Sequence, residues 1–274
     1  MPSSASFPLS MIDARGHRLT LAGPPRRILS LVPSLTELLA HLGLDDEVVG
    51  RTRFCVHPAE WKIRKPIVGG TKQVNLNCIE ALRPDLILAN LEENTQEMVE
   101  ALDRLAPTYV TDVGTVPEAL DMIRTVGRLT DRAADADSLA AGIGTAFAAL
   151  PVLRRIHAAY LIWHDPYMTV GHDTFIHDVM TRAGFVNVFG HRARYPEVTP
   201  DELVAAQPEV LLLSSEPFPF REKHFGAFRV FLPGVPIRLV DGALFSWYGH
   251  RLLQTPDYLR HLRADLDGVI RHRA

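Results

Sequence analysis

Cysteine is scarce in this sequence, with only Cys55 and Cys78 among 274 residues. Two cysteines cannot form the multiple disulfides that stabilise small secreted domains, although a single bridge between them stays open from sequence alone. The spacing of Cys55 and His57 also lacks the second ligand pair of a closed structural zinc site. We therefore expect buried thiols and a chain that is stabilised by a hydrophobic core, for which its length is sufficient.

Net positive charge and long apolar runs are also absent. The 29 Lys and Arg residues are outnumbered by 32 Asp and Glu residues, so no basic field is available to neutralise phosphates, and we expect no nucleic-acid partner. No apolar run approaches the roughly 20 residues that cross a bilayer. The first residues lack the basic and apolar regions of a secretion signal, which predicts a cytoplasmic protein if Met1 is the natural start.

The common catalytic motifs are missing as well. The sequence contains no GxSxG, P-loop, GxGxxG or HExxH pattern, which removes the usual hydrolase, NTPase, dinucleotide and zinc-protease interpretations. Cys55 and His57 are close in sequence, but no third residue that would orient them as a catalytic pair can be named. We therefore predict that the protein is not an enzyme.

Strands and helices alternate through the first hundred residues. The segment from Arg26 to Leu39, RRILSLVPSLTELL, is typical of a buried strand that continues into a helix, and Ser34 with Glu37 has the spacing of a capping box. Such alternation favours a mostly parallel sheet with helices on its faces. Strands are predicted at 27–32, 47–50, 66–69, 85–89 and 108–111, and helices at 35–43, 76–82 and 94–105.

A helical stretch then separates two regions of similar character. Residues 116–150 carry no strand signal, and an apolar stripe at helical spacing predicts a helix long enough to join two lobes. Alternation resumes with strands at 158–162, 209–213 and 237–240 and helices at 174–184, 200–206 and about 250–270. We predict an α/β fold with an N-terminal lobe at 1–115, a helical connector at 116–156 and a C-terminal lobe at 157–274.

The two lobes share a short pattern. IEALRPDLILAN at 79–90 and DELVAAQPEVLLLS at 201–214 each run from a helix through proline and an acidic residue into an apolar strand. In the second copy Thr199, Pro200 and Glu202 supply a helix cap, a first-turn proline and a capping-box partner. Each strand then leads into an acidic loop. Equivalent strand ends in two lobes are expected to face each other across a cleft.

Loops at these strand ends combine aromatic, imidazole and carboxylate side chains, which suits a planar or metal-bearing ligand. Trp163, Tyr195, Phe245 and Trp247 would stack on the ligand, since each large aromatic residue buries roughly 150–250 Å². Each group of residues has an alternative interpretation. The FSWYG segment at 245–249 would form a tight core turn, Phe218 and Phe220 would pack in the core, and Lys72 would be solvated. The candidate ligand-binding residues are Arg53, Cys55, His57, Lys72, Glu92, Glu93, Trp163, His164, Tyr195, Glu216, Phe218, Phe220, Phe245, Trp247 and Tyr248.

Three segments together resemble a known family. The sequence resembles the solute-binding proteins that serve ABC importers of vitamin B12, haem and iron siderophores, the helical-backbone metal receptors. The similarity lies in the helical joint between the lobes and in the segments RRILSLVPSLTELLAHLG, IEALRPDLILA and TPDELVAAQPEVLLLS. The resemblance covers about Asp13 to Leu262. It implies two Rossmann-like lobes joined by a single long backbone helix, a ligand in the groove between them, a monomer, an ABC permease as partner and a periplasmic location.

The sequence departs from this family in places. Asn77 stands where importer-coupled members usually carry a glutamate that docks the permease, whereas Asp201 and Glu202 keep acids for docking in the second lobe. Thr71 and Asn90 stand where corrinoid binders place tryptophans.

The leading hypothesis is reversible binding of a cobalamin-like corrinoid, haem or ferric siderophore, with no covalently held cofactor. In it Arg53 and Lys72 meet anionic or amide groups, and His57 or His164 approaches a metal axially. One alternative is direct capture of Zn²⁺ or Mn²⁺ by His57, His164 and Glu92 or Glu216. Another is a cytoplasmic corrinoid-related protein, even an enzyme, that is not coupled to an importer.

Overall fold

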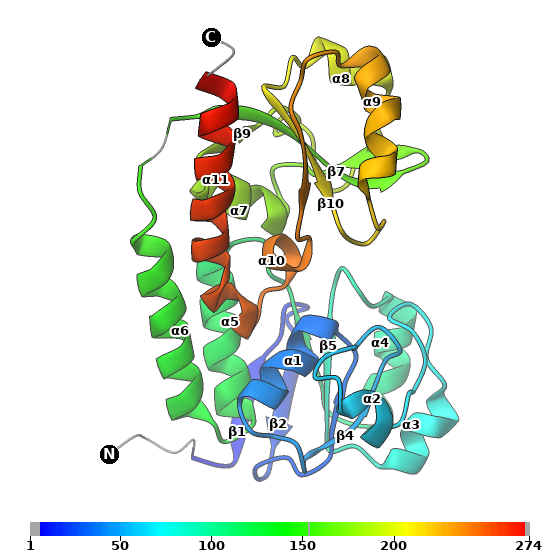
Figure 1. The fold of residues 1–274 in the computed structure, drawn as a ribbon. Helices are drawn as coiled ribbons and strands as arrows, with labels where there is room; N and C mark the ends of the chain where they lie inside the picture. Colours follow the sequence, from blue (N-terminus) through cyan, green and yellow to red (C-terminus); the bar gives the residue numbers. More distant parts are fainter. Residues whose placement is uncertain (1–5, 153, 272–274) are drawn as a thin grey trace. The chain divides into compact units, whose positions relative to one another are not determined.

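The chain contains two compact α/β units. A computed structural model describes residues 6–152 and 154–271 (Figure 1). The N-terminal unit comprises Met1–Val113, Pro117–Ile143 and Tyr248–His250, and the C-terminal unit comprises Gly114–Val116, Gly144–Trp247 and Arg251–Ala274. The mixed α/β architecture with parallel sheets that the sequence predicts is confirmed.

The N-terminal unit is built on a parallel sheet in the order β4-β3-β5-β6. Nearly all of its residues are buried, which explains why the strands read as continuous apolar runs. The predicted strand at 66–69 is wrong. Pro66 lacks a donor and Gly69 has φ of +134°, so this segment makes only isolated bridges. The strands are β3 (Ile28–Ser30), β4 (Val48–Arg51), β5 (Leu86–Asn90) and β6 (Thr108–Thr111).

Helices pack against this sheet, and an antiparallel hairpin precedes it. The sequence prediction did not include this hairpin, whose two strands have four residues each. A core cluster of the unit joins β3, β5 and β6 to α3 and α4 through residues such as Leu31, Ile79, Ile87 and Leu102. The elements are β1 (Leu9–Ile12), β2 (Arg18–Leu21), α1 (Pro33–His41), α2 (Trp61–Arg64), α3 (Leu76–Leu82) and α4 (Gln96–Asp103).

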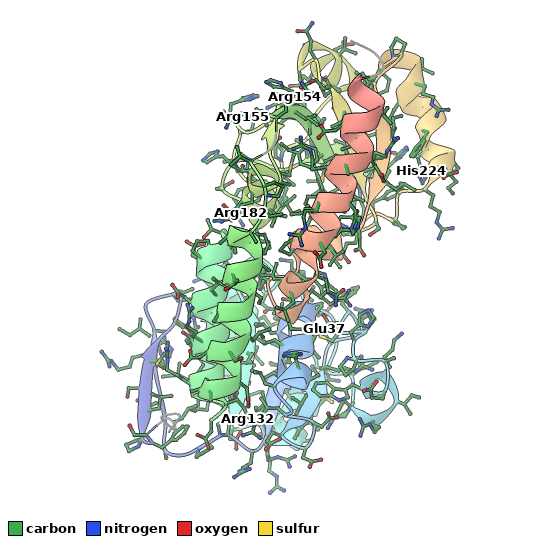
Figure 2. The ribbon with its side chains drawn as sticks, turned by 60° about the vertical axis from the view of Figure 1, so that its left-hand side comes forward. Glu37, Arg132, Arg154, Arg155, Arg182 and His224 are labelled. Carbon is green, nitrogen blue, oxygen red and sulfur yellow. The ribbon has the colours of Figure 1, made fainter. Side chains whose placement is uncertain are left out.

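The predicted capping box at the start of α1 is wrong. Pro33 occupies the first turn, so the N-cap is Val32, which makes no side-chain cap. Thr36 instead donates from Oγ1 to the Val32 carbonyl at 2.9 Å. The Glu37 carboxylate, labelled on α1 in Figure 2, lies 3.7 Å from Nδ1 of His250.

Two helices follow the first sheet, within the region that the sequence predicts to be helical. They are α5 (Val116–Leu129) and α6 (Ala133–Ala148), and both figures draw them side by side. Gly127 allows this packing, because a Cβ atom there would lie 2.2 Å from the Ala136 Cβ. One division between the units falls inside α6, between Ile143 and Gly144, so α6 continues from one unit into the other.

The sheet of the C-terminal unit has the order β11-β10-β7-β8, with β9 also paired to β7. Only β8 is antiparallel, because it forms a tight hairpin with β7. The predicted strands at 158–162, 209–213 and 237–240 are confirmed. The strands are β7 (Ile156–His164), β8 (Tyr167–Thr169), β9 (Phe185–Asn187), β10 (Val210–Ser214) and β11 (Ile237–Val240).

The helices of this unit include the three that the sequence predicts. The buried Arg263 of α11 donates to the carbonyls of Ala183 and Arg154 at 2.5 and 2.7 Å, which fixes α11 against the end of α7. Among the described residues, no helix is both long and apolar enough to cross a membrane. The helices are α7 (Phe175–Arg182), α8 (Pro200–Ala205), α9 (Phe225–Phe231), α10 (Ala243–Ser246) and α11 (Thr255–Arg271).

The capping box of α8 is present as predicted, and it yields a stability prediction. Thr199 Oγ1 accepts from the Glu202 N–H at 3.2 Å, and the Glu202 carboxylate accepts from the Thr199 N–H at 2.7 Å. Thr199→Ala is expected to lower the free energy of unfolding by about 1 kcal/mol, because the first-turn donor loses its partner. Urea denaturation measures this change. Thr199→Ser, which keeps the acceptor, serves as the control, and equal losses in the two variants would contradict the cap.

Candidate functional site

The loop after β4 is organised by a buried arginine. Arg51 is 2% exposed, and its guanidinium donates to the carbonyls of Trp61, Thr52 and Cys55 at 3.0, 3.1 and 3.2 Å. No carboxylate pairs with it among the described residues. Arg51 is not predictable as a functional residue, because an arginine inside an apolar strand does not indicate which loop its side chain stabilises.

Arg53 and Phe54 lie on the outside of this loop. The Arg53 N–H donates to the Gly69 carbonyl at 2.8 Å, and its guanidinium lies 5.5 Å from the centre of the Phe54 ring. A Cβ atom on Gly70 would approach the Arg53 Nη2 to 3.0 Å, so the glycine leaves room for the guanidinium. Arg53 is therefore an exposed cation with a defined backbone anchor.

Two further loops of the N-terminal unit are tied to each other. Asn90 is 1% exposed, and its Oδ1 accepts from the N–H groups of Glu92 and Glu93 at 2.9 and 3.3 Å. Asn94 Nδ2 donates to the Thr71 carbonyl at 2.8 Å, and the exposed Lys72 ammonium donates to the Glu92 carbonyl.

The structure thus brings Arg53, Lys72, Glu92 and Glu93 into one group of loops, residues 52–54, 69–73 and 90–94. Thr71 and Asn90, which stand where corrinoid binders place tryptophans, are buried within it. This loop group offers charge and hydrogen bonds, and Phe54 is its exposed ring.

Cys55 is wrongly predicted as a ligand-binding residue. Its side chain is fully buried against Thr52, with Sγ 3.2 Å from the Thr52 hydroxyl, and burial raises the pKa of the thiol. Both cysteines are free, so the possible Cys55–Cys78 bridge is absent. Cys55 contributes to the core, whereas His57 in the same loop is exposed.

The C-terminal unit carries an aromatic patch formed by Trp163, His164, Tyr167, Phe218, Phe220 and His224. Trp163 is 39% exposed, and its indole N–H donates to the Asp165 carbonyl at 3.1 Å. His164 stacks on Phe218 at 5.3 Å and 19°, while Trp163 meets Phe218 edge-on at 5.8 Å and 67°. Phe220 is 4% exposed and forms the floor of the patch, and its contact with a ligand stays a prediction. Phe218, two residues earlier and on the same face, is half-buried and packs against Phe220 with ring centres 4.8 Å apart.

His224, labelled in Figure 2, belongs to this patch and was missed by sequence analysis. Its ring lies 5.3 Å from both His164 and Phe218. Its Nδ1 accepts from the Arg221 N–H at 2.9 Å. Because the residue precedes a helix of only seven residues, no sequence periodicity places it beside the β7–β8 hairpin.

Glu216 holds Trp247 in place. Its Oε1 accepts from the Trp247 indole N–H at 2.7 Å and from the Ser246 hydroxyl at 2.9 Å. Gly242 makes room for it, since a Cβ atom there would lie 2.5 Å from the Glu216 Cγ. Arg251 stacks over the other side of this network, 4.8 Å from the Trp247 ring centre. The Glu216 carboxylate therefore orients Trp247, and a contact with a ligand stays a prediction.

The core-turn interpretation of the FSWYG segment is correct for two of its rings. Phe245 is fully buried and packs 5.2 Å from Tyr160 and 6.3 Å from Tyr258, and Tyr248 is 6% exposed. The predicted ligand contact of the fully buried Phe245 is therefore wrong, whereas that of Tyr248 stays a prediction. The segment forms the short helix α10 rather than a strand, and this turns Phe245 into the core while Trp247 stays half-buried.

Tyr195 lies in the loop between β9 and α8. It is half-buried, and the Arg194 guanidinium lies 5.8 Å from its ring centre. Upstream in the same segment, Asn187 Nδ2 donates to the Val170 carbonyl at 2.8 Å and lies 3.2 Å from His177 Nδ1. The Asn187 Oδ1 accepts from the Phe189 N–H, which fixes the orientation of the amide and makes His177 Nδ1 an acceptor. His177 must therefore be neutral in this arrangement.

A pH dependence follows from His177. Burial, and then the nearby charge of His172, lower its pKa, while Asp178 and Asp173 act in the opposite direction. Protonation therefore favours the unfolded chain. Stability is full above pH 6.5 and falls as the pH drops from 6.5 through the lowered folded-state pKa, by at most about 1.4 kcal/mol per pH unit from this one group. Chemical denaturation from pH 5 to 8 should show a smaller decline for His177→Gln, and identical slopes would refute the assignment.

The acids predicted to dock a permease differ in their surroundings. Glu202 bonds to the Arg192 guanidinium and to the Thr199 N–H, and the Arg192 bond lowers its pKa. Asp201, its neighbour on α8, is exposed. Within residues 6–152 and 154–271, no three His, Cys, Asp or Glu side chains are grouped so that they could hold a metal ion. His57 belongs to the N-terminal unit and His164 to the C-terminal unit.

The chain has two α/β units with parallel strands, and a helix continues from one unit into the other. Loops at the strand ends carry side chains of the kinds that bind ligands. These features define the class of two-lobed solute-binding proteins. Residues 28–227 match the model of the family described as periplasmic binding protein, and the chain belongs to this family.

Relatives and solved structures agree with this assignment. The chain is 28% identical over 204 residues to the vitamin B12-binding protein of Vibrio parahaemolyticus, covering 72% of this chain and 74% of that one. It is 26% identical over 219 residues to an uncharacterized ABC transporter substrate-binding lipoprotein of Bacillus subtilis, covering 75% and 69%.

Two solved structures share the fold. The periplasmic vitamin B12-binding protein of Vibrio cholerae has a TM-score of 0.72 at 22% identity, covering 88% of this chain and 98% of that one. The apo periplasmic haem-binding protein of Roseiflexus has a TM-score of 0.75 at 21% identity, covering 90% and 100%. At this identity the two structures establish the fold alone.

Proposed function

We propose that this protein is a receptor that reversibly binds a corrinoid, haem or another metal chelate and does not convert it. The observation that carries the proposal is the aromatic patch, in which an exposed tryptophan stands beside an imidazole on a fixed aromatic floor. A planar ligand gains most of its affinity from such rings. The names of the relatives, which include vitamin B12-binding and cobalamin-binding proteins, support this ligand class.

Polar groups then select among such ligands. We assign Arg53 and Lys72 to carboxylate, amide or phosphate groups of the ligand, because both are exposed cations: the Arg53 backbone is anchored to the Gly69 carbonyl, and the Lys72 ammonium is positioned by the Glu92 carbonyl. Trp247 is a second stacking residue, whose ring is oriented by Glu216.

We also propose that the protein has a role in transport. The substrate-binding lipoprotein of Bacillus subtilis supports an ABC permease as partner and a location outside the cytoplasm. Asp201 is the docking acid that we favour, since the neighbouring Glu202 is bonded to Arg192.

A titration of the purified protein tests the ligand class. Cyanocobalamin, aquocobalamin, haemin and a ferric hydroxamate siderophore are added separately, and tryptophan quenching and visible absorbance are recorded. Saturable binding of at least one of them supports the proposal, and no change with any of them refutes it. Stoichiometric Zn²⁺ or Mn²⁺ that survives dialysis, without chelate binding, would favour the direct metal receptor instead.

A further inference from the structure

We propose that the segment Tyr248–His250, held on helix α1, is an anchor that positions the stacking residue Trp247, and that His250 and Glu37 are positioning residues. The inference rests on the proposed function, in which Trp247 stacks on the ligand, and it adds residues that do not themselves touch the ligand. Trp247 directly precedes the anchor segment in the chain. The contacts of the anchor segment therefore limit where the Trp247 backbone can lie.

The anchor segment belongs to a different unit from its neighbours in the chain. Tyr248–His250 is part of the N-terminal unit, whereas the residues up to Trp247 and those from Arg251 onward are part of the C-terminal unit. Tyr248 is 6% exposed and Gly249 is buried, so the segment packs into the N-terminal unit. Holding so short a segment in one place costs conformational entropy, which specific contacts must offset.

One stripe of α1 supplies these contacts. Ser34, Glu37, Leu38 and His41 have the spacing i, i+3, i+4 and i+7, which places them on one side of the helix. A Cβ atom on Gly249 would lie 2.9 Å from the Ser34 carbonyl oxygen and 3.7 Å from the Leu38 Cβ. The absence of a side chain at this position therefore lets the two backbones approach each other closely.

His250 meets the other two residues of the stripe. Its ring stacks on His41 with ring centres 4.9 Å apart and an angle of 15°. Its Nδ1 lies 3.7 Å from the Glu37 carboxylate, and the His250 and Glu37 side chains are only 20% and 12% exposed. At this distance a protonated imidazole and the carboxylate form an ion pair that water screens only in part. Stacking and charge thus hold the same ring on α1.

The Trp247 side chain is held by other residues. Glu216 accepts a hydrogen bond from its indole N–H, and the Arg251 guanidinium lies over its ring. These contacts orient the indole, whereas the anchor segment restrains the backbone that follows it. Loss of the anchor leaves the Glu216 contact in place but lets the backbone shift. Ligand affinity should therefore fall without being abolished.

The first test observes Trp247 in the protein without ligand. The chain has three tryptophans, so labelling with fluorotryptophan gives three resonances in fluorine NMR. Trp247→Phe and Trp163→Phe assign them. Trp61, in the N-terminal unit, and Trp163, in the C-terminal unit, then report on each unit separately.

Three substitutions disturb the anchor in different ways. His250→Gln removes the imidazole, Glu37→Gln removes the carboxylate charge, and Gly249→Ala adds a Cβ atom against α1. We expect each to shift or broaden the Trp247 resonance and to leave the resonances of the other two tryptophans unchanged. His261→Gln, at an exposed histidine of α11, is the control and should change none of them.

The second test measures affinity at pH 6.5, with haemin and cyanocobalamin titrated separately. Each of the three substitutions should weaken the binding of the chelate that wild type prefers by about three- to tenfold. The double variant Glu37→Gln with His250→Gln should bind about as tightly as either single variant, because both lose the same contact. His250→Lys keeps a cation beside Glu37 and should stay within about twofold of wild type.

The outcomes separate the anchor from the proposed function. An unchanged Trp247 resonance in all three variants would overturn the anchor, and so would equal changes in all three tryptophan resonances, which indicate a general loss of structure. A changed Trp247 resonance with wild-type affinity would show that the anchor does not serve binding. If no chelate binds to wild type, the proposed function is wrong, and the NMR spectra alone decide whether the segment positions Trp247.

Discussion

Trp163→Ala is expected to weaken the binding of the preferred macrocycle by about ten- to 60-fold. The indole is 39% exposed, and a stacked ligand that covers roughly 100 Å² of this surface gains about 2.5 kcal/mol. Trp163→Phe should recover part of the loss, because a smaller ring still offers a flat apolar face. Fluorescence or absorbance titration of the two variants and wild type gives the affinities.

The same substitution should leave folding nearly unchanged. Trp163 lies at the end of β7 and is partly exposed, so the free energy of unfolding should change by less than about 1 kcal/mol. Val230→Ala, on the exposed face of α9 in the same unit, is the control and should change neither quantity. Wild-type affinity in Trp163→Ala would mean that the aromatic patch is not the ligand site.

Arg51→Met is expected to lower the free energy of unfolding by about 2–4 kcal/mol. Methionine fills a similar length but removes the donors that reach the carbonyls of Trp61, Thr52 and Cys55, all inside the protein. Urea denaturation monitored by circular dichroism measures the loss.

Arg53→Ala is the matched control for this prediction. It removes an exposed guanidinium two residues away, and its stability should stay within about 0.5 kcal/mol of wild type. A similar loss in both variants would show that the buried position of Arg51 is not what matters. A small loss in Arg51→Met would show that the loop after β4 does not depend on this side chain.

Much of the fold was predictable because buried parallel strands are continuous apolar runs. Residues 85–89 and 209–213 are such runs, and both form central strands. The two predicted capping boxes differ in outcome, because proline follows a different residue in each. Proline at the first helical position makes the preceding residue the N-cap. This residue is Thr199 before Pro200, but before Pro33 it is Val32, whose side chain cannot accept a hydrogen bond. The position of proline therefore distinguishes the true capping box from the false one.

The candidate site was predictable in part. Exposed side chains on loops, such as Arg53, Lys72 and Trp163, were identified from their residue types. The sequence did not distinguish these exposed residues from the buried Phe220, Phe245 and Cys55, because it does not show which side of a loop faces the core. His224 gave no signal either, since its contact with the β7–β8 hairpin exists only in the folded unit.

The most direct test of reversible binding without conversion is equilibrium dialysis of the protein against aquocobalamin and haemin, followed by release and mass analysis of the ligand. The account predicts one bound macrocycle per chain, full exchange with free ligand, and recovery of the macrocycle with unchanged mass. Recovery of a chemically altered macrocycle, or no retention of either compound, would contradict it.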